Sequence, residues 1–449
     1  MGYRMRSNGH FLGRVFQWFI APRVFLVLGL AIYVGTTLWT LRSCIESPDG
    51  RADLVSGDAG HYLSIADDFS KGNYSMNYVK NWPHRQPLYP ALLATIYWSE
   101  GRDVLHRKIE LEQKELKEKK ESQAIGQQQE GDLWWLALVN VVLGALGFVV
   151  TYLGMVLLFP QRWIAAAVGL LYMGNSFLGA QITRHLLTEP LHILLMMLVI
   201  LSFYAFLKNG RAWTLYLAVL AGGLDYLARP NGLLVTASFF GALVCGDLWL
   251  IVTRRNEIDA GIILRRVGLY AGCVLLFAVV TMPSWVPRQR IFGNPIYAGY
   301  LNNYLWVDTY KEGHVGENGP RYHLKDYLAT HSAGDFVMRW GKGIWNVVFD
   351  IPWRTEDRKP VLYLCAWGGV LLAAFRGPPA CRIILLFGVV QLLPLIWTNM
   401  SNPNLRVPYA STLPFELFFA AVFFAWLAGE EARQLFASLW SRFSRKQEA

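Results

Sequence analysis

Long apolar stretches recur from one end of the sequence to the other, separated by short polar turns and by two long polar segments. A helix that crosses the hydrocarbon core of a bilayer needs about 20 predominantly apolar residues. Stretches of this kind predict about ten membrane-spanning helices, at roughly residues 24–41, 133–158, 163–180, 190–207, 213–227, 232–252, 267–283, 361–375, 381–398 and 409–428. The stretch 213–227 is short and contains Asp225, so the pattern leaves open whether 213–252 is two spans or one re-entrant element. The predicted fold class is therefore all-α and integral to the membrane.

The placement of charge predicts how these spans are oriented. Cytoplasmic turns between spans carry an excess of Lys and Arg, and with the N-terminus inside, the basic residues of the short turns fall on the inner side. They are Arg162, Lys208, Arg211, Arg254, Arg255, Arg265, Arg266, Arg376 and Arg382. This orientation makes residues 1–23 and 429–449 cytoplasmic and places two long segments outside, 42–132 as a first outer loop and 284–360 as a large outer loop. We expect a single multi-span domain over residues 1–449.

Two segments of the first outer loop predict helices that lie on the membrane surface. Residues 58–70 repeat apolar side chains at helical spacing, with Asp67 and Asp68 between them, which is typical of an amphipathic helix. A second segment of this kind follows Pro87, at 88–98. Helices in this position would close a site toward the membrane.

Composition excludes several other classes of protein. Charged residues make up 16% of the chain and hydrophobic residues 54%, with a formal net charge of +10. Soluble domains carry roughly a quarter charged residues and disordered chains are poor in apolar residues, so neither class fits. The basic excess lies in the inner turns, which argues against a nucleic-acid partner. The sequence contains neither CxxC spacing nor a GxxxxGK[ST] or GxGxxG phosphate loop, which argues against a zinc site and nucleotide hydrolysis.

Polar clusters at the predicted outer ends of the spans are the candidate functional residues, because ionisable groups in lipid cost several kcal/mol and are rarely placed there without a role. The clusters contain Asp58, His61 and Tyr62; His84, Arg85 and Tyr89; Arg184, His185 and Glu189; Asp225, Arg229 and Asn231; and Asn402 to Arg406. Each has a structural alternative, such as a helix N-cap at Asp58 or an ion pair between Asp225 and Arg229. Their position on one side favours a common site. A divalent cation at Asp58 and His61 stays an open alternative without diagnostic spacing, so no metal or other cofactor is assigned.

Four short motifs carry a resemblance to a known family. GDAGHYLSIADDFSKGNY, RQPLYPALLA, RHLLTEPLH and ARPNGLL follow one another over residues 57–234. In these motifs the chain resembles the integral-membrane glycosyltransferases of the GT-C fold, in the branch of aminoarabinose transferases and protein O-mannosyltransferases. The resemblance implies transfer of a sugar from a polyprenyl-phosphate carrier to a lipid, glycan or protein acceptor on the outer side. The essential acid of the family falls on Asp58, and a further acid falls on Glu189; many members have two adjacent acids at the first motif, where this chain has Asp58 and Ala59.

The residue chemistry agrees with that implication. A carboxylate such as Asp58 can take the proton of an attacking acceptor, which predicts a single inverting displacement in which Glu189 positions the acceptor or the sugar. Guanidinium and imidazole groups would stabilise the departing phosphate, and the candidates are Arg85, Arg184, His84 and His185. The remaining candidates for substrate binding are His61, Tyr62, Tyr89, Arg229, Asn231 and Arg406.

Two other functions fit the same residues. A transporter or flippase for a lipid-linked sugar would bind the substrate without reacting, although transporters usually place such groups near the midplane. An envelope polysaccharide polymerase or ligase would use a related lipid-linked donor. The compact chain without additional lumenal domains favours a bacterial inner membrane, with both termini cytoplasmic and the active site facing the periplasm. The predicted partners are the polyprenyl-phosphate-linked sugar, its acceptor and the lipid bilayer.

Overall fold

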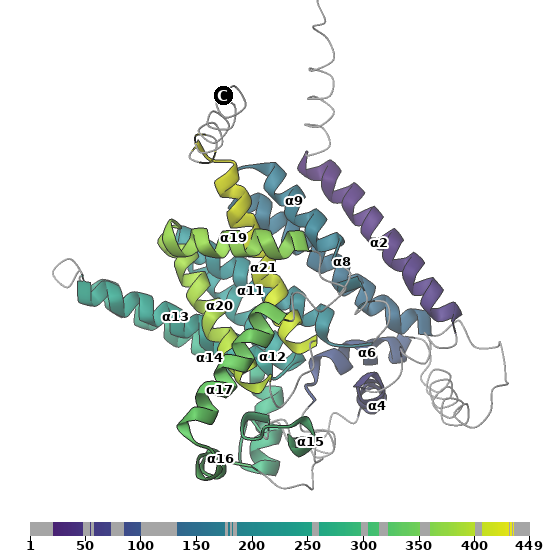
Figure 1. The fold of residues 1–449 in the computed structure, drawn as a ribbon. Coiled ribbons are helices and arrows are strands. Elements are labelled where there is room, and N and C mark those ends of the chain that lie inside the picture. The colour runs from purple at the N-terminus through teal and green to yellow at the C-terminus, as the bar shows by residue number, and fades with distance from the viewer. Residues whose placement is uncertain are drawn as a thin grey trace, which may run out of the picture.

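The structure is a computed structural model, and it describes residues 21–47, 54, 58–72, 85–99, 133–175, 178–179, 182, 186–253, 260–297, 304–313, 322–350, 360–399, 406–430, 432 and 434. Within these residues all the regular elements are helices (Figure 1). In chain order they are α2 (Pro22–Glu46), α4 (Asp58–Ser70), α6 (Leu88–Ser99), α8 (Leu133–Leu158), α9 (Arg162–Met173), α11 (Glu189–Asn209), α12 (Ala212–Ala228), α13 (Asn231–Thr253), α14 (Ala260–Phe292), α15 (Tyr310–Gly313), α16 (Leu324–Thr330), α17 (Ala333–Ile344), the π-helical turn η3 (Trp345–Asp350), α19 (Pro360–Phe375), α20 (Pro379–Thr398) and α21 (Arg406–Leu427).

The predicted spans all coincide with helices. In the described part of the chain, seven helices are long and apolar enough to cross a membrane, namely α2, α8, α11, α13, α14, α20 and α21. The shorter apolar helices α9, α12 and α19 account for the other predicted spans. The segment 213–252 forms two helices, α12 and α13. The span predicted at 163–180 is shorter than expected, because α9 ends at Met173.

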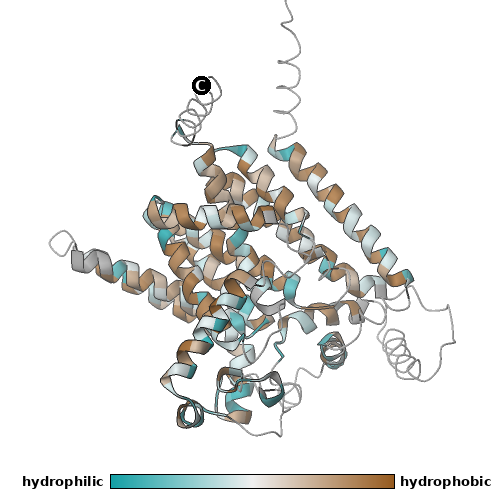
Figure 2. Cartoon of the chain, in the orientation of Figure 1, coloured by the Kyte–Doolittle hydropathy of each residue, from teal (hydrophilic) through white to brown (hydrophobic). Residues whose placement is uncertain are grey.

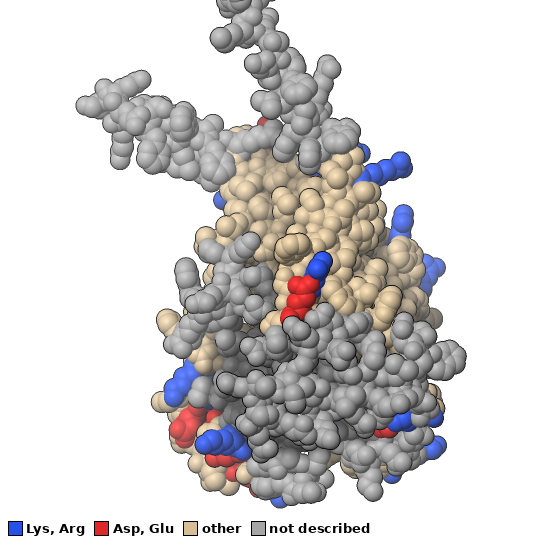
Figure 3. Space-filling model, turned by 90° about the vertical axis from the view of Figure 1, so that its right-hand side faces the viewer, with Lys and Arg blue, Asp and Glu red and all other residues tan. Residues whose placement is uncertain are grey.

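Apolar side chains cover the outside of the bundle as well as its interior. Trp39 of α2 and Leu275 of α14 are 73% and 66% exposed, and brown, hydrophobic ribbon runs along the outer helices in Figure 2. Figure 3 shows a broad area of the upper part with few charged side chains, whereas charges gather toward the lower end. A water-soluble protein rarely exposes such large apolar surfaces. The chain is therefore an integral membrane protein.

The helix α11 forms the centre of the bundle. Its apolar side chains are buried along most of its length, and it packs against α8, α12, α20 and α21. The helix α12 returns alongside it, and Gly232 lets the start of α13 approach the last turn of α12, because a Cβ at this position would lie 2.1 Å from the backbone nitrogen of Tyr226. This close approach fixes the connection that carries Arg229.

Several short helices gather at one end of the bundle. The helices α4, α6, α15, α16 and α17 lie at the lower end in Figure 1, while α2 begins and α21 ends at the upper end. The predicted surface helices at 58–70 and 88–98 are α4 and α6, which pack against each other. The helix α14 has 33 residues and is therefore about 50 Å long, which is more than the hydrocarbon thickness of about 30 Å.

A buried arginine joins the short helices α16 and α17 to the bundle. Arg339 of α17 lies between the rings of Tyr327 and Trp397, with its guanidinium carbon 5.0 and 4.3 Å from the ring centroids. It donates hydrogen bonds to the carbonyl oxygens of Trp397 and Tyr304, at 3.0 and 3.1 Å. A third bond of 3.0 Å goes to the carboxylate of Asp308. Since these partners belong to α16, α20 and the segment before α15, one guanidinium ties all three together.

His331 completes this contact. Its Nε2 lies 2.7 Å from Asp308, its Nδ1 lies 2.9 Å from the carbonyl oxygen of Tyr327, and its ring stacks on Tyr327. The hydrogen bond to Asp308 raises the pKa of His331, helped by the Tyr327 carbonyl and the charges of Asp308 and Asp335, against desolvation, which lowers it. Both ring nitrogens face acceptors, so the protonated imidazole fits best.

We expect the packing of α16 and α17 to weaken as pH rises. A histidine with a raised folded-state pKa stabilises fully below the ordinary value of about 6.5, and this contribution is lost as pH rises through the raised value. Amide hydrogen exchange of α16 and α17 in the wild type and in His331→Gln checks this at matched pH. The two proteins should differ at about pH 5.5 and converge by about pH 9; a difference that does not depend on pH would contradict the account.

Candidate functional site

Asp58 and Arg85 form an ion pair at the start of α4. The carboxylate Oδ1 lies 2.5 Å from Nη2 of Arg85, and an acid is favourable at the first position of a helix because it faces the positive end of the helix dipole. The Asp58 side chain is 40% exposed, whereas that of Arg85 is 13% exposed. The pair is therefore open to solvent on the carboxylate side and enclosed on the guanidinium side.

Two further residues of α4 contact the same guanidinium. Nη2 of Arg85 lies 3.1 Å from Nδ1 of His61, and Nη1 donates to the hydroxyl of Tyr62 at 3.3 Å. The guanidinium carbon also lies 5.1 Å from the centroid of the Tyr62 ring, a cation–π distance. Asp58, His61 and Tyr62 share one face of α4 because they are spaced by three and four residues. We refer to Asp58, His61, Tyr62 and Arg85 as the Asp58 group.

Arg288 of α14 holds the backbone that carries Arg85. Its side chain is fully buried, and its Nη2 donates to the carbonyl oxygen of Arg85 at 3.0 Å. Its Nε donates to the carbonyl of Tyr297 at 2.9 Å, and Nη1 donates to the hydroxyl of Ser284. Ser284 in turn donates to the side chain of Gln86 at 3.0 Å. The C-terminal end of α14 thus fixes residues 85 and 86.

Tyr89 packs against the Asp58 group, and Glu189 at the start of α11 is near enough to affect its pKa. It is fully buried in α6, its hydroxyl donates to Asn140 at 2.8 Å, and its ring meets that of Tyr62 edge-on. Burial raises the pKa of Tyr89 well above its ordinary value, and nearby Tyr62 and Glu189 raise it further, against the bond to Asn140, which lowers it. Tyr89 is therefore a neutral donor with Glu189 in its surroundings.

A second polar group lies between α11, α12 and α21. Nη1 of Arg229 is 3.2 Å from Oε1 of Glu189, and both side chains are largely buried. One turn further into the bundle, Nδ1 of His192 lies 2.6 Å from Oδ1 of Asp225, and its Nε2 lies 3.2 Å from the hydroxyl of Ser411. We refer to these five residues as the Glu189 group.

The expected ion pair between Asp225 and Arg229 is wrong. Asp225 pairs with His192 and Arg229 pairs with Glu189. The reason is local: Arg229 follows the last residue of α12 and has extended backbone, with φ −147° and ψ 144°. Its side chain therefore leaves the helical face of Asp225 and meets α11, which the spacing rule for a continuous helix does not describe.

The structure thus brings together seven of the predicted site residues in two neighbouring groups linked by Tyr89. Asn231 is the first residue of α13, and Arg406 begins α21 with a side chain that the structure does not describe. His84, Arg184 and His185 lie outside the described residues. In the part of the chain with described positions, no group of three His, Cys, Asp or Glu side chains could hold a metal ion.

Sequence reasoning missed Arg288, His192 and Ser411. His192 lies three residues after Glu189 and hence on the same helical face, so the spacing could have found it. Arg288 and Ser284 are four residues apart at the end of an apolar stretch, which marks a polar face but not its partner. Nothing near Ser411 in the sequence indicates its contact with His192.

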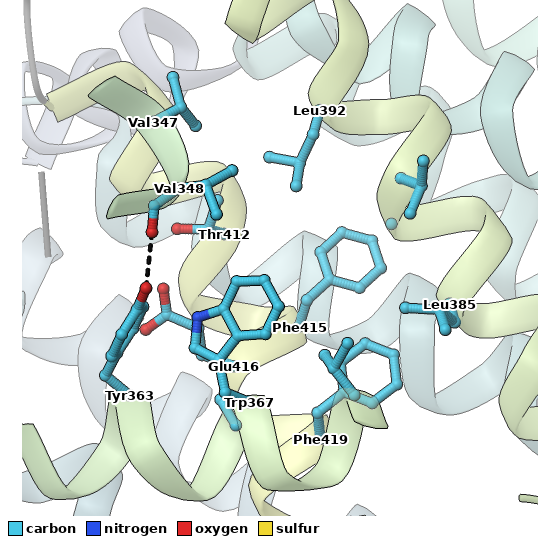
Figure 4. A pocket seen from close by; sticks show the side chains of 14 residues that line it. Val347, Val348, Tyr363, Trp367, Leu385, Leu392, Thr412, Phe415, Glu416 and Phe419 are labelled. Carbon is cyan, nitrogen blue, oxygen red and sulfur yellow. Dashed lines mark hydrogen bonds between the residues drawn. The ribbon is translucent and has the colours of Figure 1, made fainter. Parts of the chain in front are cut away.

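An apolar cavity of about 160 Å³ lies elsewhere in the bundle, between α19, α20, α21 and η3. Figure 4 shows Tyr363, Thr412 and Glu416 on one side of it and Leu385, Phe415 and Phe419 on the other. The hydroxyl of Tyr363 donates to the carbonyl of Val348 at 2.6 Å. A cavity of about 150 Å³ can hold a benzene molecule, so this one has room for a short stretch of an apolar chain.

Comparison with known proteins gives limited similarity. No protein-family model matches the sequence, and no curated protein sequence matches it. The crystal structure of ArnT from Cupriavidus metallidurans bound to undecaprenyl phosphate aligns with 88% of this chain and 59% of its own, at 14% identity and a TM-score of 0.47. The apo structure of the same protein aligns with 88% of this chain and 76% of its own, at 15% identity and a TM-score of 0.38. The chain spans less than two thirds of the first of these structures, and no family or reaction follows from such scores.

We expect Arg288→Ala to lower the free energy of unfolding by about 2–4 kcal/mol, because it leaves the carbonyls of Arg85 and Tyr297 without a buried donor. Arg290→Ala is the matched control, since Arg290 is exposed on the same helix end and should change stability by less than about 0.5 kcal/mol. Chemical unfolding in mixed micelles measures both. Equal stability of the two variants would show that Arg288 does not hold this segment.

Proposed function

We propose that the chain is a membrane glycosyltransferase that moves a sugar from a polyprenyl-phosphate donor to an acceptor hydroxyl or amine at the outer face of a bacterial inner membrane. The observation that carries the proposal is the Asp58–Arg85 pair, a half-exposed carboxylate 2.5 Å from an enclosed guanidinium at the edge of an apolar bundle. A base and an anion-binding group side by side at a membrane surface suit a reaction whose donor is a lipid phosphate. The four ordered motifs of residues 57–234 support the same reaction.

The proposed reaction is a single displacement with inversion. The acceptor oxygen or nitrogen bonds to the anomeric carbon of the sugar, the bond from that carbon to the phosphate oxygen breaks, and its electron pair leaves with polyprenyl phosphate. Asp58 takes the acceptor proton. Since the Asp58 carboxylate is the solvent-facing member of its pair, the proton can then pass to water.

Arg85 has the geometry to receive the donor phosphate. Its guanidinium is held in place through the backbone by Arg288, and His61 and Tyr62 surround it. A planar guanidinium binds two phosphate oxygens at once, so an arriving phosphate competes with Asp58 for it. When Arg85 turns to the phosphate, Asp58 loses its counter-ion and becomes a stronger base. His84, Arg184 and His185 are further candidates for this phosphate.

The apolar tail of the donor would lie against the bundle. The cavity between α19, α20 and α21 has a wall formed by Leu385, Phe415 and Phe419, and we propose it for a segment of that tail. Burial of such a segment contributes about 25 cal/mol per Å² of apolar surface. Glu189, near Tyr89, is the candidate for positioning the acceptor or the sugar.

Asp58→Asn should lower kcat/KM about 10³-fold, because the amide cannot take the acceptor proton. The measurement is the initial rate of sugar transfer from polyprenyl-phosphate-linked sugars in nanodiscs. Asp68→Asn, on the same helix and outside the Asp58 group, is the control and should keep nearly full activity. Equal activity of Asp58→Asn and the wild type would remove Asp58 from the reaction.

Arg85→Ala should lower kcat/KM by about 10²–10³ and weaken inhibition by the product polyprenyl phosphate. Arg85→Lys should recover part of the loss, since lysine keeps the charge but not the two-pronged contact. Inhibition constants for polyprenyl phosphate measured on the three proteins check this. An inhibition constant that does not change in Arg85→Ala would place the phosphate elsewhere.

A further inference from the structure

Arg229 and two carboxylates, Glu189 and Asp225, belong to one buried polar group between α11 and α12. Arg229 is within ion-pair distance of Glu189, 3.2 Å, but its Nη1 is a buried atom that forms no hydrogen bond within the described structure. Asp225, four residues earlier, is fully buried; its Oδ1 contacts His192, and its Oδ2 likewise has no hydrogen-bond partner there. A buried donor and a buried acceptor thus remain unsatisfied close together in the sequence, which folded proteins usually avoid.

The surroundings of Asp225 favour an additional cation. Asp225 lies in the last turn of α12, where the negative end of the helix dipole disfavours a carboxylate. His192, its present partner, lies in the first turn of α11, at the positive end of that helix dipole. Glu189 and Arg229 lie at the same two helix ends, where their charges are the favourable ones. The guanidinium of Arg229 is the cation whose backbone is already joined to Asp225, since its N–H donates to the Asp225 carbonyl at 2.7 Å.

We propose that Arg229 exchanges its carboxylate partner, moving between Glu189 and Asp225. In the second position its Nη1 donates to Oδ2 of Asp225, which gives a hydrogen bond to two buried atoms that lack one in the described structure. His192 of α11, which also contacts Ser411 of α21, holds Asp225 in place during the exchange. The exchange itself leaves the net charge of the group unchanged.

The consequence of the exchange is a free Glu189. This carboxylate is close enough to Tyr89 to raise the pKa of that phenol, and Tyr89 packs against Tyr62 of the Asp58 group. A released Glu189 therefore accepts hydrogen bonds from hydroxyl groups of the sugar or the acceptor beside Asp58. This consequence, unlike the exchange itself, rests on the proposed glycosyl transfer. Arg229 and Asp225 are positioning residues that act through Glu189.

Carboxyl labelling with dicyclohexylcarbodiimide tests the exchange without any substrate. The reagent modifies carboxyl groups that are protonated in apolar surroundings, and a nearby guanidinium keeps a carboxylate ionised. In the wild type each carboxylate is released for part of the time, so mass spectrometry should find label on Glu189. In Asp225→Asn the guanidinium stays with Glu189, and labelling of Glu189 should fall about fivefold or more, since a shift of about 1 kcal/mol has this size.

The reciprocal variant distinguishes the exchange from a folding defect. In Glu189→Gln the guanidinium stays with Asp225, so labelling of Asp225 should fall, and Arg229→Gln should raise labelling of both carboxylates. Asp247→Asn is the matched control: Asp247 is paired with Arg266 and Tyr270 at another end of the bundle, and its loss should leave Glu189 labelling unchanged. Unchanged labelling of Glu189 in Asp225→Asn and of Asp225 in Glu189→Gln would overturn the exchange.

Turnover separates this inference from the proposed function. If sugar transfer occurs, Asp225→Asn should lower kcat about tenfold and leave the inhibition constant of polyprenyl phosphate unchanged, because Asp58 and Arg85 are intact. Wild-type kcat in Asp225→Asn would overturn the role of the exchange in catalysis. Reciprocal labelling in a protein that uses no polyprenyl-phosphate donor would uphold the exchange and reject the glycosyltransferase.

Discussion

The cost of placing charge in a low-dielectric interior determines how the polar end of this bundle is organised. A charged side chain removed from water is tolerated only when counter-ions or hydrogen-bond acceptors replace the water. Arg288 and Arg339 satisfy this condition with backbone carbonyls from several elements. Arg288 thereby joins α14 to the segment that carries Arg85, and Arg339 joins α17 to α20 and to the segment that carries Tyr304. The hydrogen bonds that offset the cost of burying these arginines therefore also hold the short helices against the bundle.

That organisation leaves the Asp58 group rigid on one side and open on the other. Arg85 is enclosed and held through its backbone, whereas Asp58 keeps contact with solvent. Because the backbone of Arg85 is held in place, only its side chain has to turn when an anion arrives, and a carboxylate near water can release a proton. The Glu189 group, by contrast, is almost wholly buried, so its charges interact mainly with one another and with Tyr89.

The apolar stretches predicted the spans well because membrane helices must satisfy their backbone internally and therefore show long apolar runs. The early end of α9 was not predictable from hydropathy, since it depends on Asn175, whose side chain accepts from the backbone of Leu178 and donates to Tyr409. The position of Asp58, His61 and Tyr62 on one face of α4 followed from their helical spacing. The position of the candidate residues at one end of the bundle followed from the alternation of spans. The contact with Arg85 needed the packing of α4 on α6.

The partners of single charges were the least predictable part of the site. Arg229 has extended backbone after α12 and crosses to Glu189, although its spacing from Asp225 suggested a pair along one helix. Arg288 reaches Arg85 across 203 residues of sequence, and no local pattern indicates such a contact. Sequence periodicity fixes the face of a helix, whereas the pairing of charges depends on where the chain turns between helices.

The most direct test of the central claim is whether polyprenyl phosphate leaves its sugar only when an acceptor is supplied. Purified protein in nanodiscs is incubated with a panel of polyprenyl-phosphate-linked sugars, with and without lipid, glycan and peptide acceptors, and released polyprenyl phosphate is quantified. The account predicts release with at least one donor that depends on an acceptor. Tight binding of a donor without release in any combination would contradict it and would favour transport of a lipid-linked sugar.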